Sequence, residues 1–261
     1  MADLTTLAAV KNYLGITLPA QDKVISSLIS RESMVIQNWT GRVFPTVTRT
    51  SFWVNGSGSD RLMLPDAPII SVSALQIGTY VILPSPDGIQ QGFTYDDTMI
   101  YLKPGAYTDS KFPRGYQNVK ATWLAGYRTS ETDFVPAGAA PTITPMAGGS
   151  AVSAVGVVYA STGNAMTQVG SLPLVGQFSF AAGAFSFNQS DYNAQVTMTY
   201  DYVPAAVEQA CIEMVGLDLK QRDNLGVQSK SLAGETVSYT SKGMTDSSKE
   251  MLMPFRKVAP I

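Results

Sequence analysis

The chain has 261 residues, 45% of them hydrophobic and 15% charged, and its formal net charge is −2. This charge balance excludes counterion release on a polyanion such as DNA as the driving force of binding. The sequence contains no histidine, which excludes Ser-His and Cys-His nucleophile pairs and most catalytic zinc sites. Because soluble domains carry about 25% charged residues, we expect part of this surface to face another protein.

Neither export nor a membrane span is expected. The first ten residues include Asp3 and no basic residue, so they lack the basic start of a secretory signal peptide. No run approaches the roughly 20 apolar residues that cross a bilayer. The single Cys211 cannot form an intramolecular disulfide, which fits synthesis in a reducing compartment.

Two helices are predicted in the first forty residues. Apolar residues recur at helical spacing over 4–14, with Asp3 or Thr5 placed to cap the helix. A second apolar stripe, with polar residues on the opposite side, predicts an amphipathic helix of about five turns over 19–41. Each segment ends at a glycine, the residue that most readily adopts the left-handed conformation at a helix C-terminus.

The pattern changes to strand chemistry from Thr46. Short runs rich in β-branched and aromatic residues alternate with Gly, Pro and Asp turns. The glycine-rich stretch 55–58 lies between two such runs, so we interpret it as a hairpin turn and not as a phosphate-binding loop. The predicted strands are 47–54, 61–64, 69–77, 80–83, 93–95, 99–102 and 119–124.

A long uncharged segment follows. No charged residue lies between Asp133 and Asp191, yet aromatic residues recur with a period of two, which favours a β-sandwich over a flexible linker. A Val-Pro-Ala triplet follows both Phe134 and Tyr202, as expected when a domain is inserted into a loop whose ends stay close. We therefore predict an inserted all-β domain over 135–202.

Helical periodicity returns after the uncharged segment. A helix is predicted from Pro204 to the Asn-Leu-Gly at 224–226, followed by an extended polar arm over 229–240. A short last helix is predicted around 246–253, where proline then breaks it. The residues placed to cap this helix are Asp246, Ser247 and Ser248.

The candidate reactive residues all have a simpler structural interpretation. Cys211 falls on the apolar stripe of its helix, so we expect a small buried side chain and not a nucleophile. The adjacent Asp96 and Asp97 would point apart on extended chain, so we expect a turn and not a carboxylate dyad. Glu131 and Asp133 are expected in a solvated loop. We predict no catalytic residue, no metal site and no cofactor.

One set of basic and aromatic residues could suggest a nucleic-acid groove. On alternating strand positions these side chains should divide between two faces of a sheet, so we do not predict a groove. The set comprises Lys111, Arg114, Lys120 and Arg128 with Phe112, Tyr116, Trp123 and Tyr127.

Five short motifs in a fixed order resemble the head-tail connector family of tailed bacteriophages, also called adaptor or head completion proteins. The resemblance covers about residues 1–133 and 203–261. Where that family has a short connection, this chain carries the uncharged segment, which is similar to immunoglobulin-like modules of phage structural proteins. The motifs are Trp39-Thr-Gly-Arg42, Leu64-Pro-Asp-Ala-Pro-Ile-Ile-Ser-Val-Ser73, Ala125-Gly-Tyr127, Val203-Pro-Ala-Ala-Val-Glu-Gln-Ala210 and Met253-Pro-Phe-Arg-Lys-Val258.

The resemblance implies an α+β fold with a small helical bundle. The two N-terminal helices and the long helix of the C-terminal half form the bundle, beside a β-rich middle region. The implied domains are 1–134 plus 203–261 as the connector domain and 135–202 as the inserted immunoglobulin-like domain. Residues 226–261 are expected to form an extended C-terminal arm with a short helix.

The resemblance also implies a function in virion assembly. Copies of the chain would form a ring, dodecameric in the family, that binds the portal protein of the DNA-filled head and extends the DNA channel. A stopper or tail terminator would bind next, and DNA would pass without specific binding. We expect assembly in the host cytoplasm, a final place in the neck of the virion, and no membrane contact.

In the family the C-terminal region docks on the portal. Apolar side chains of this region could enter a cleft on the partner, while its two cations pair with acidic groups. The matching positions are Met251, Leu252, Phe255, Arg256, Lys257, Val258 and Ile261.

Two alternatives to the connector role remain open. The first is another virion role, as a tail terminator or stopper, in which the C-terminal region binds something other than a portal. The second, from a different class, is a surface- or glycan-binding module in which the inserted 135–202 segment carries the binding.

Overall fold

The protein has an α+β fold, as predicted, and its chain forms two compact units. The computed structural model describes residues 3–44, 46–222, 229–232, 235–238 and 244–257. Unit 1 comprises Met1–Arg42 and Thr129–Lys257, and unit 2 comprises Val43–Arg128 and Val258–Ile261. No helix in the described ranges is both long and apolar enough to cross a bilayer.

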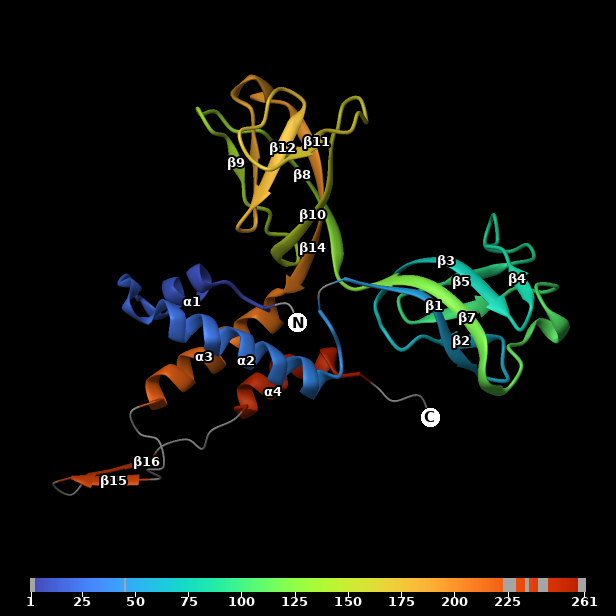
Figure 1. Ribbon diagram of the computed structural model, residues 1–261, viewed down its shortest axis with the longest axis horizontal. Coiled ribbons are helices and arrows are strands. Elements are labelled where there is room, and N and C mark those ends of the chain that lie inside the picture. The colour runs from blue at the N-terminus through green and yellow to red at the C-terminus, as the bar shows by residue number, and fades with distance from the viewer. Residues whose placement is uncertain (1–2, 45, 223–228, 233–234, 239–243, 258–261) are drawn as a thin grey trace. The chain divides into compact units, whose positions relative to one another are not determined.

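The helices of unit 1 form a small bundle (Figure 1). The long helices α2 and α3 pack against each other, α1 contacts both, and α4 packs on α3. The helices predicted from apolar periodicity are therefore confirmed, while the end predicted for the third helix at 224–226 lies outside the described residues. Their bounds are α1 Leu7–Leu14, α2 Asp22–Thr40 after a 3-10 turn at Pro19–Gln21, α3 Ala205–Gln221 and α4 Asp246–Leu252 before a 3-10 turn at Met253–Phe255.

The start of α1 differs from the prediction. Thr6 is the N-cap, and its side chain accepts a hydrogen bond from the backbone N–H of Ala9 at 3.1 Å. The predicted caps Asp3 and Thr5 were wrong because Leu4 is buried, and its N–H donates to the Ser33 hydroxyl at 2.9 Å. The segment before α1 is therefore held against α2 and does not join the first helical turn.

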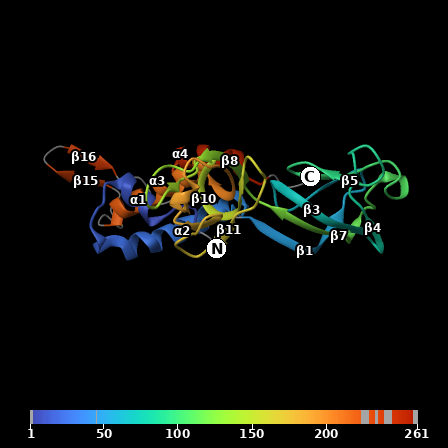
Figure 2. The same cartoon turned by 90° about the horizontal axis from the view of Figure 1, so that it is seen from above.

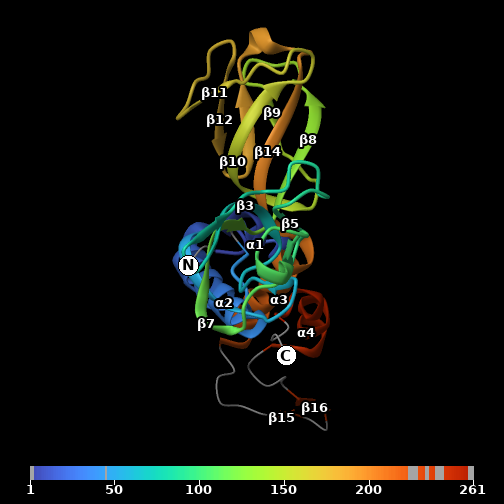
Figure 3. The ribbon, with the colours of Figure 1, turned by 90° about the vertical axis from the view of Figure 1, so that its right-hand side faces the viewer.

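The strands of unit 1, β8 to β14, form what we call the β-module, in which two sheets enclose an aromatic core (Figure 3). One sheet has the order β10-β14-β8 and the other the order β11-β12-β13-β9. The strands predicted from the period-two aromatic pattern are present. Their bounds are β8 Arg128–Phe134, β9 Thr142–Ile143, β10 Gly149–Tyr159, β11 Thr167–Val169, β12 Gln177–Ala181, β13 Ala184–Phe187 and β14 Gln195–Pro204.

The first strand of the β-module begins before residue 135. β8 lies beside β14, and two pairs of hydroxyls bridge them at 2.8 Å, Ser130 to Thr199 and Thr132 to Thr197. The two chain segments that enter and leave the β-module are therefore neighbours in one sheet, as an insertion requires. The division into a connector domain and a separate inserted domain over 135–202 stays a prediction.

Unit 2 consists of two sheets that pack around one hydrophobic core containing Trp123. The sheets have the orders β1-β7-β3-β4 and β2-β6-β5, and the first three strands of the larger sheet lie side by side in Figure 2. The bounds are β1 Val47–Gly56, β2 Arg61–Met63, β3 Ile69–Ile77, β4 Tyr80–Ile82, β5 Phe93–Tyr95, β6 Met99–Leu102 and β7 Gly115–Ala125.

One local prediction for a connection was wrong. The glycine-rich stretch 55–58 is not a hairpin turn, because β1 and β2 belong to different sheets and do not pair. Of the polar arm predicted as extended over 229–240, the structure describes 229–232 and 235–238, which form an antiparallel pair, β15 Ser229–Leu232 with β16 Glu235–Ser238. Residues 233–234 and 239–240 lie outside the described residues, and the extended C-terminal arm over 226–261 stays a prediction.

The Ala125-Gly-Tyr127 motif has a steric basis. Gly126 has a φ of 135°, and a Cβ atom there would lie 2.6 Å from the Cα of Thr46. Its N–H donates to the carbonyl of Pro68 at 2.8 Å. Only glycine tolerates both the backbone conformation and the close approach, so this residue allows β7 to end against the neighbouring chain.

The β-module gives a direct stability prediction. Phe185 is fully buried and contacts the rings of Phe178 and Phe180, so Phe185→Ala should lower the free energy of unfolding by about 3–5 kcal/mol. The matched control Leu172→Ala, at a side chain that is 89% exposed, should change it by less than about 0.5 kcal/mol. Urea unfolding followed by near-UV circular dichroism measures both, and equal effects would contradict the assigned core.

Candidate functional site

The predicted docking segment begins with the short helix α4. Its N-cap is Thr245, whose hydroxyl oxygen accepts from the N–H of Ser248 at 3.1 Å and contacts the Ser248 hydroxyl at 2.9 Å. The predicted caps Asp246, Ser247 and Ser248 were therefore wrong. Ser248 is fully buried, and its hydroxyl bonds the hydroxyl of the N-cap residue Thr245 instead of capping the helix itself.

The docking residues of α4 and the turn after it are partly used by the protein's own core. Leu252 is fully buried, in a helix that packs on α3, while Met251 and Phe255 are partly buried. Pro254 lies in the 3-10 turn, and the N–H of Arg256 donates to the Met253 carbonyl at 3.1 Å. Leu252 therefore stabilises the subunit and is not exposed to a partner in this conformation.

The last described residues are bound to the C-terminus of α2. The N–H of Lys257 donates to the Thr40 carbonyl at 2.7 Å, and the Arg256 guanidinium lies 5.3 Å from the ring centroid of Trp39. The last carbonyls of a helix have no partner within the helix, and cations are stabilised beside them. The backbone of Lys257 thus gives a carbonyl at the C-terminus of α2 a hydrogen-bond partner, and the charges of the same segment lie beside this helix end.

This contact brings two of the sequence motifs together. Trp39-Thr-Gly41 ends α2, and a Cβ atom on Gly41 would lie 3.3 Å from the Cβ of Lys257. The motif at 253–258 was more than two hundred positions away in the sequence, and no local pattern linked the two. The side chains of Arg256 and Lys257 remain exposed, whereas Val258 and Ile261 lie outside the described residues. The docking role of the whole set stays a prediction.

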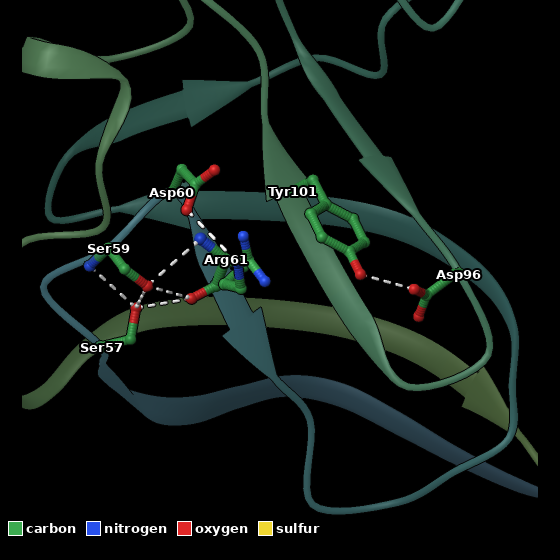
Figure 4. A network of polar contacts seen from close by, with 6 residues as sticks. All are labelled: Ser57, Ser59, Asp60, Arg61, Asp96 and Tyr101. Atoms are coloured by element: carbon green, nitrogen blue, oxygen red, sulfur yellow. Dashed lines mark hydrogen bonds and ion pairs between the residues drawn. The ribbon is translucent and has the colours of Figure 1, made fainter.

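A second polar cluster lies on unit 2, around the β5–β6 turn (Figure 4). One carboxylate oxygen of Asp96 accepts from the N–H groups of Thr98 and Met99, each at 2.8 Å, and the other accepts from the Tyr101 hydroxyl at 2.6 Å. The pKa of Asp96 is lowered to about 2, mainly by the hydrogen bond from Tyr101 and to a smaller extent by the backbone hydrogen bonds. The prediction of turn chemistry at this position is confirmed.

The serines of the same cluster also bond within their own turn. The hydroxyls of Ser57 and Ser59 donate to the carbonyl of Arg61 at 2.6 and 3.0 Å, and Arg61 forms an exposed ion pair with Asp60 at 3.5 Å (Figure 4). These bonds shape the connection between β1 and β2. A phosphate-binding loop directs backbone N–H groups toward its ligand, but here the N–H of Gly58 donates to the Phe112 carbonyl at 3.0 Å and that of Gly56 to the Asn118 side chain at 2.7 Å.

The only thiol of the chain is inaccessible. Cys211 is fully buried in α3, with its sulfur 3.6 Å from the Ser33 hydroxyl oxygen, and burial raises the pKa of the thiol to about 12. The interpretation of a small buried side chain is confirmed, because nucleophilic attack requires an accessible thiolate. Among the described residues, no three His, Cys, Asp or Glu side chains gather where they could hold a metal ion.

The basic and aromatic set does not form one surface. Phe112 and Trp123 are buried in the core of unit 2, whereas Tyr116 is 78% exposed. The ammonium group of Lys120 lies 5.5 Å from the ring centroid of Trp53, a residue outside the set. The predicted division of these side chains between two faces is therefore confirmed.

Glu131 has a structural role that the sequence did not suggest. It lies on β8 and not in a solvated loop, and its carboxylate accepts from the N–H groups of Met146 and Ala147 at 3.0 and 3.1 Å. It also accepts a hydrogen bond from the hydroxyl of Tyr200 at 3.0 Å. The pKa of Tyr200 is raised mainly by its burial and secondly by this hydrogen bond. Ser130 and Thr132 lie two positions apart in the sequence, the spacing of residues on one face of a strand, and this pattern could have predicted β8.

Sequence comparison assigns the chain to a family. A family profile described as "Head completion protein" matches residues 3–138, more than half of the chain. The chain belongs to the head completion protein family. The matched range runs from the start of the helical bundle through unit 2 and β8, and stops before β9. The connector resemblance was expected over 1–133 and 203–261; the family match covers the first of these ranges, and the resemblance over 203–261 stays a prediction.

More distant comparisons add little to this assignment. A chain of a solved structure described as "Neck of empty GTA particle computed with C6 symmetry" aligns over 99% of this head completion protein and 92% of its own length. The two share 11% sequence identity, with a TM-score of 0.38. No curated protein sequence matches the chain. The assignment therefore depends on the family match.

The pH dependence of Asp96 tests the polar cluster. Its pKa of about 2 lies below the ordinary value of 3.8, so its hydrogen bonds stabilise the fold fully above pH 3.8 and lose this effect as the pH falls toward 2. Tyr101→Phe removes the strongest of these bonds, so the pKa of Asp96 should rise, as measured by ¹³C NMR titration of the carboxyl group. Ser59→Ala, the control, should leave it unchanged. An unchanged pKa in Tyr101→Phe would contradict the assignment.

Proposed function

We propose that this head completion protein is a structural subunit of the phage neck that joins the DNA-filled head to the next neck or tail component. The family match over residues 3–138 is the observation that carries this proposal. The role is one of assembly, and we assign no catalytic reaction to the chain. The buried Cys211 and the absence of histidine support this choice.

The proposed assembly is a ring of identical copies below the portal, with twelve subunits as in the connector family. The ring would be assembled in the host cytoplasm, bind the portal on one side and a stopper or tail terminator on the other, and extend the DNA channel. Subunits that must hold identical neighbours need uncharged contact surface, which agrees with a charged content of only 15%.

DNA is proposed to pass through this ring without being bound. The net charge of the chain is −2, and several of its cations are already paired with carboxylates. Lys11 bonds Asp22 at 2.7 Å, and Arg49 bonds Asp66 at 2.8 Å. Cations that are neutralised within the protein release few counterions from a polyanion, so they give little affinity for DNA.

The proposed portal-docking site is the exposed part of the C-terminal segment. Arg256 and Lys257 are fixed by the α2 contact yet keep their charges at the surface, where they can pair with acidic groups of a partner. Phe255 and Met251 are partly exposed beside them. Leu252 would contribute only by holding α4 in place.

The β-module is proposed to be a separate inserted domain that contacts the capsid or the tail. Its aromatic core is made of residues between 135 and 200, so its fold does not require the helices. Its 134–190 part contains no charged residue, which suits contact with another protein. A surface- or glycan-binding role of the same domain would appear as glycan affinity of the full chain that mutations in the C-terminal segment leave intact.

Electron microscopy of the protein mixed with its cognate portal tests the proposal. Deleting 250–261 would remove the buried Leu252 and disturb the bundle, so the sharper variant is Arg256→Ala with Lys257→Ala. We expect this double variant to lose the complex because two charge pairs are lost at the contact. Lys249→Ala, the control, removes a cation of α4 that already pairs with Asp246, and should still bind.

The outcomes separate the site from the function. If the double variant binds the portal normally, the docking site is wrong although the neck role stands. If the unaltered protein binds a tail component and not the portal, a tail-terminator or stopper role replaces the connector role.

A further inference from the structure

The β-module joins the helices without a flexible linker. β14 ends at Pro204 and α3 begins at Ala205, so strand and helix are continuous. Pro204 provides no side-chain cap, but the N–H of Ala205 donates to the carbonyl of Gly148, at the base of β10, at 3.2 Å. The β-module thereby satisfies one of the N–H groups that have no partner in the first turn of α3.

One carboxylate connects this junction to the start of the chain. Glu208, in the first turn of α3, accepts a hydrogen bond from the Ser150 hydroxyl at 2.5 Å through one oxygen. Its other oxygen accepts from the Thr5 hydroxyl at 3.2 Å. These partners are 58 and 203 positions away in the sequence. A negative charge at the N-terminus of a helix is also stabilised by the helix dipole.

Packing at the same junction is incomplete. A cavity of about 380 Å³ lies between the helices and the β-module, lined by Leu4 and Ile29 on one side and Val152 and Phe180 on the other, with Glu208 at its wall. This space is partly open to solvent, so the apolar side chains on its two sides do not bury one another across it. The aromatic core of the β-module closes within the module itself. Hydrogen bonds therefore hold this junction where apolar packing does not.

We propose that Glu208 is the positioning residue that fixes the orientation of the β-module on the helical bundle. The junction opens at a lower free energy than the β-module core or the helical core. It has few buried apolar contacts, and both of its segments depend on hydrogen bonds to the one carboxylate of Glu208. The Ser150 bond holds the β-module, and the Thr5 bond holds the segment before α1. Loss of either bond affects its own segment and leaves both cores folded.

Hydrogen exchange of the full chain, followed by mass spectrometry, tests this proposal. Ser150→Ala should make the amides of 147–152 exchange about tenfold faster, because the base of β10 loses a bond to a charged group. Exchange in α2 and in β12 and β13 should not change. Thr5→Ala should accelerate exchange only over 3–7, and Glu208→Ala should accelerate both segments.

Glu213→Ala is the matched control, because Glu213 lies on the same helix and bonds only Gln209, at 2.9 Å, among the contacts that the structure gives for it. It should leave 147–152 unchanged. If Ser150→Ala leaves exchange over 147–152 unchanged, the proposal is overturned. It is equally overturned if exchange rises to the same extent in β12 and β13, because the module then unfolds as a whole instead of moving at its base. Ser150→Ala decides the question even if Glu208→Ala does not fold.

Discussion

The hydrogen bond between the N–H of Lys257 and the carbonyl of Thr40 closes the helical bundle. It ties the last described residue to the end of α2, while α4 packs on α3 and α3 packs on α2. Helices α1 and α2 before Val43 and helices α3 and α4 after Pro204 share one bundle, so the chain between Arg42 and Ala205 must leave the bundle and return to it. This intervening stretch forms β1 to β7 of unit 2 and the β-module, each with its own hydrophobic core.

This arrangement fits a protein whose task is to hold neighbours. The polar groups that could perform chemistry are used for structure: Asp96 shapes a turn, Glu131 anchors a loop and Cys211 fills a helix interface. The cations of Arg256 and Lys257 are exposed at the end of the described chain. The family match and this distribution of charge together support an assembly role.

The sequence predicted the helices and most strands because apolar periodicity directly reports which face is buried. It failed where long-range contacts compete with local chemistry. Thr6 is the N-cap of α1 because Leu4, two residues earlier, is buried. Strand β8 is stabilised by hydrogen bonds between its hydroxyl groups and those of β14. The burial of Leu252 and the stacking of Arg256 on α2 could not be predicted, because neither partner lies near them in the sequence.

The neck role is the central claim, and particle assembly without this polypeptide measures it most directly. Electron microscopy would count filled heads that carry tails, in particles made with the chain, without it, and with the chain supplied separately. The account predicts that filled heads accumulate without tails when the chain is missing and that supplying it restores joining. Heads joined to tails at the usual frequency in its absence would contradict the account.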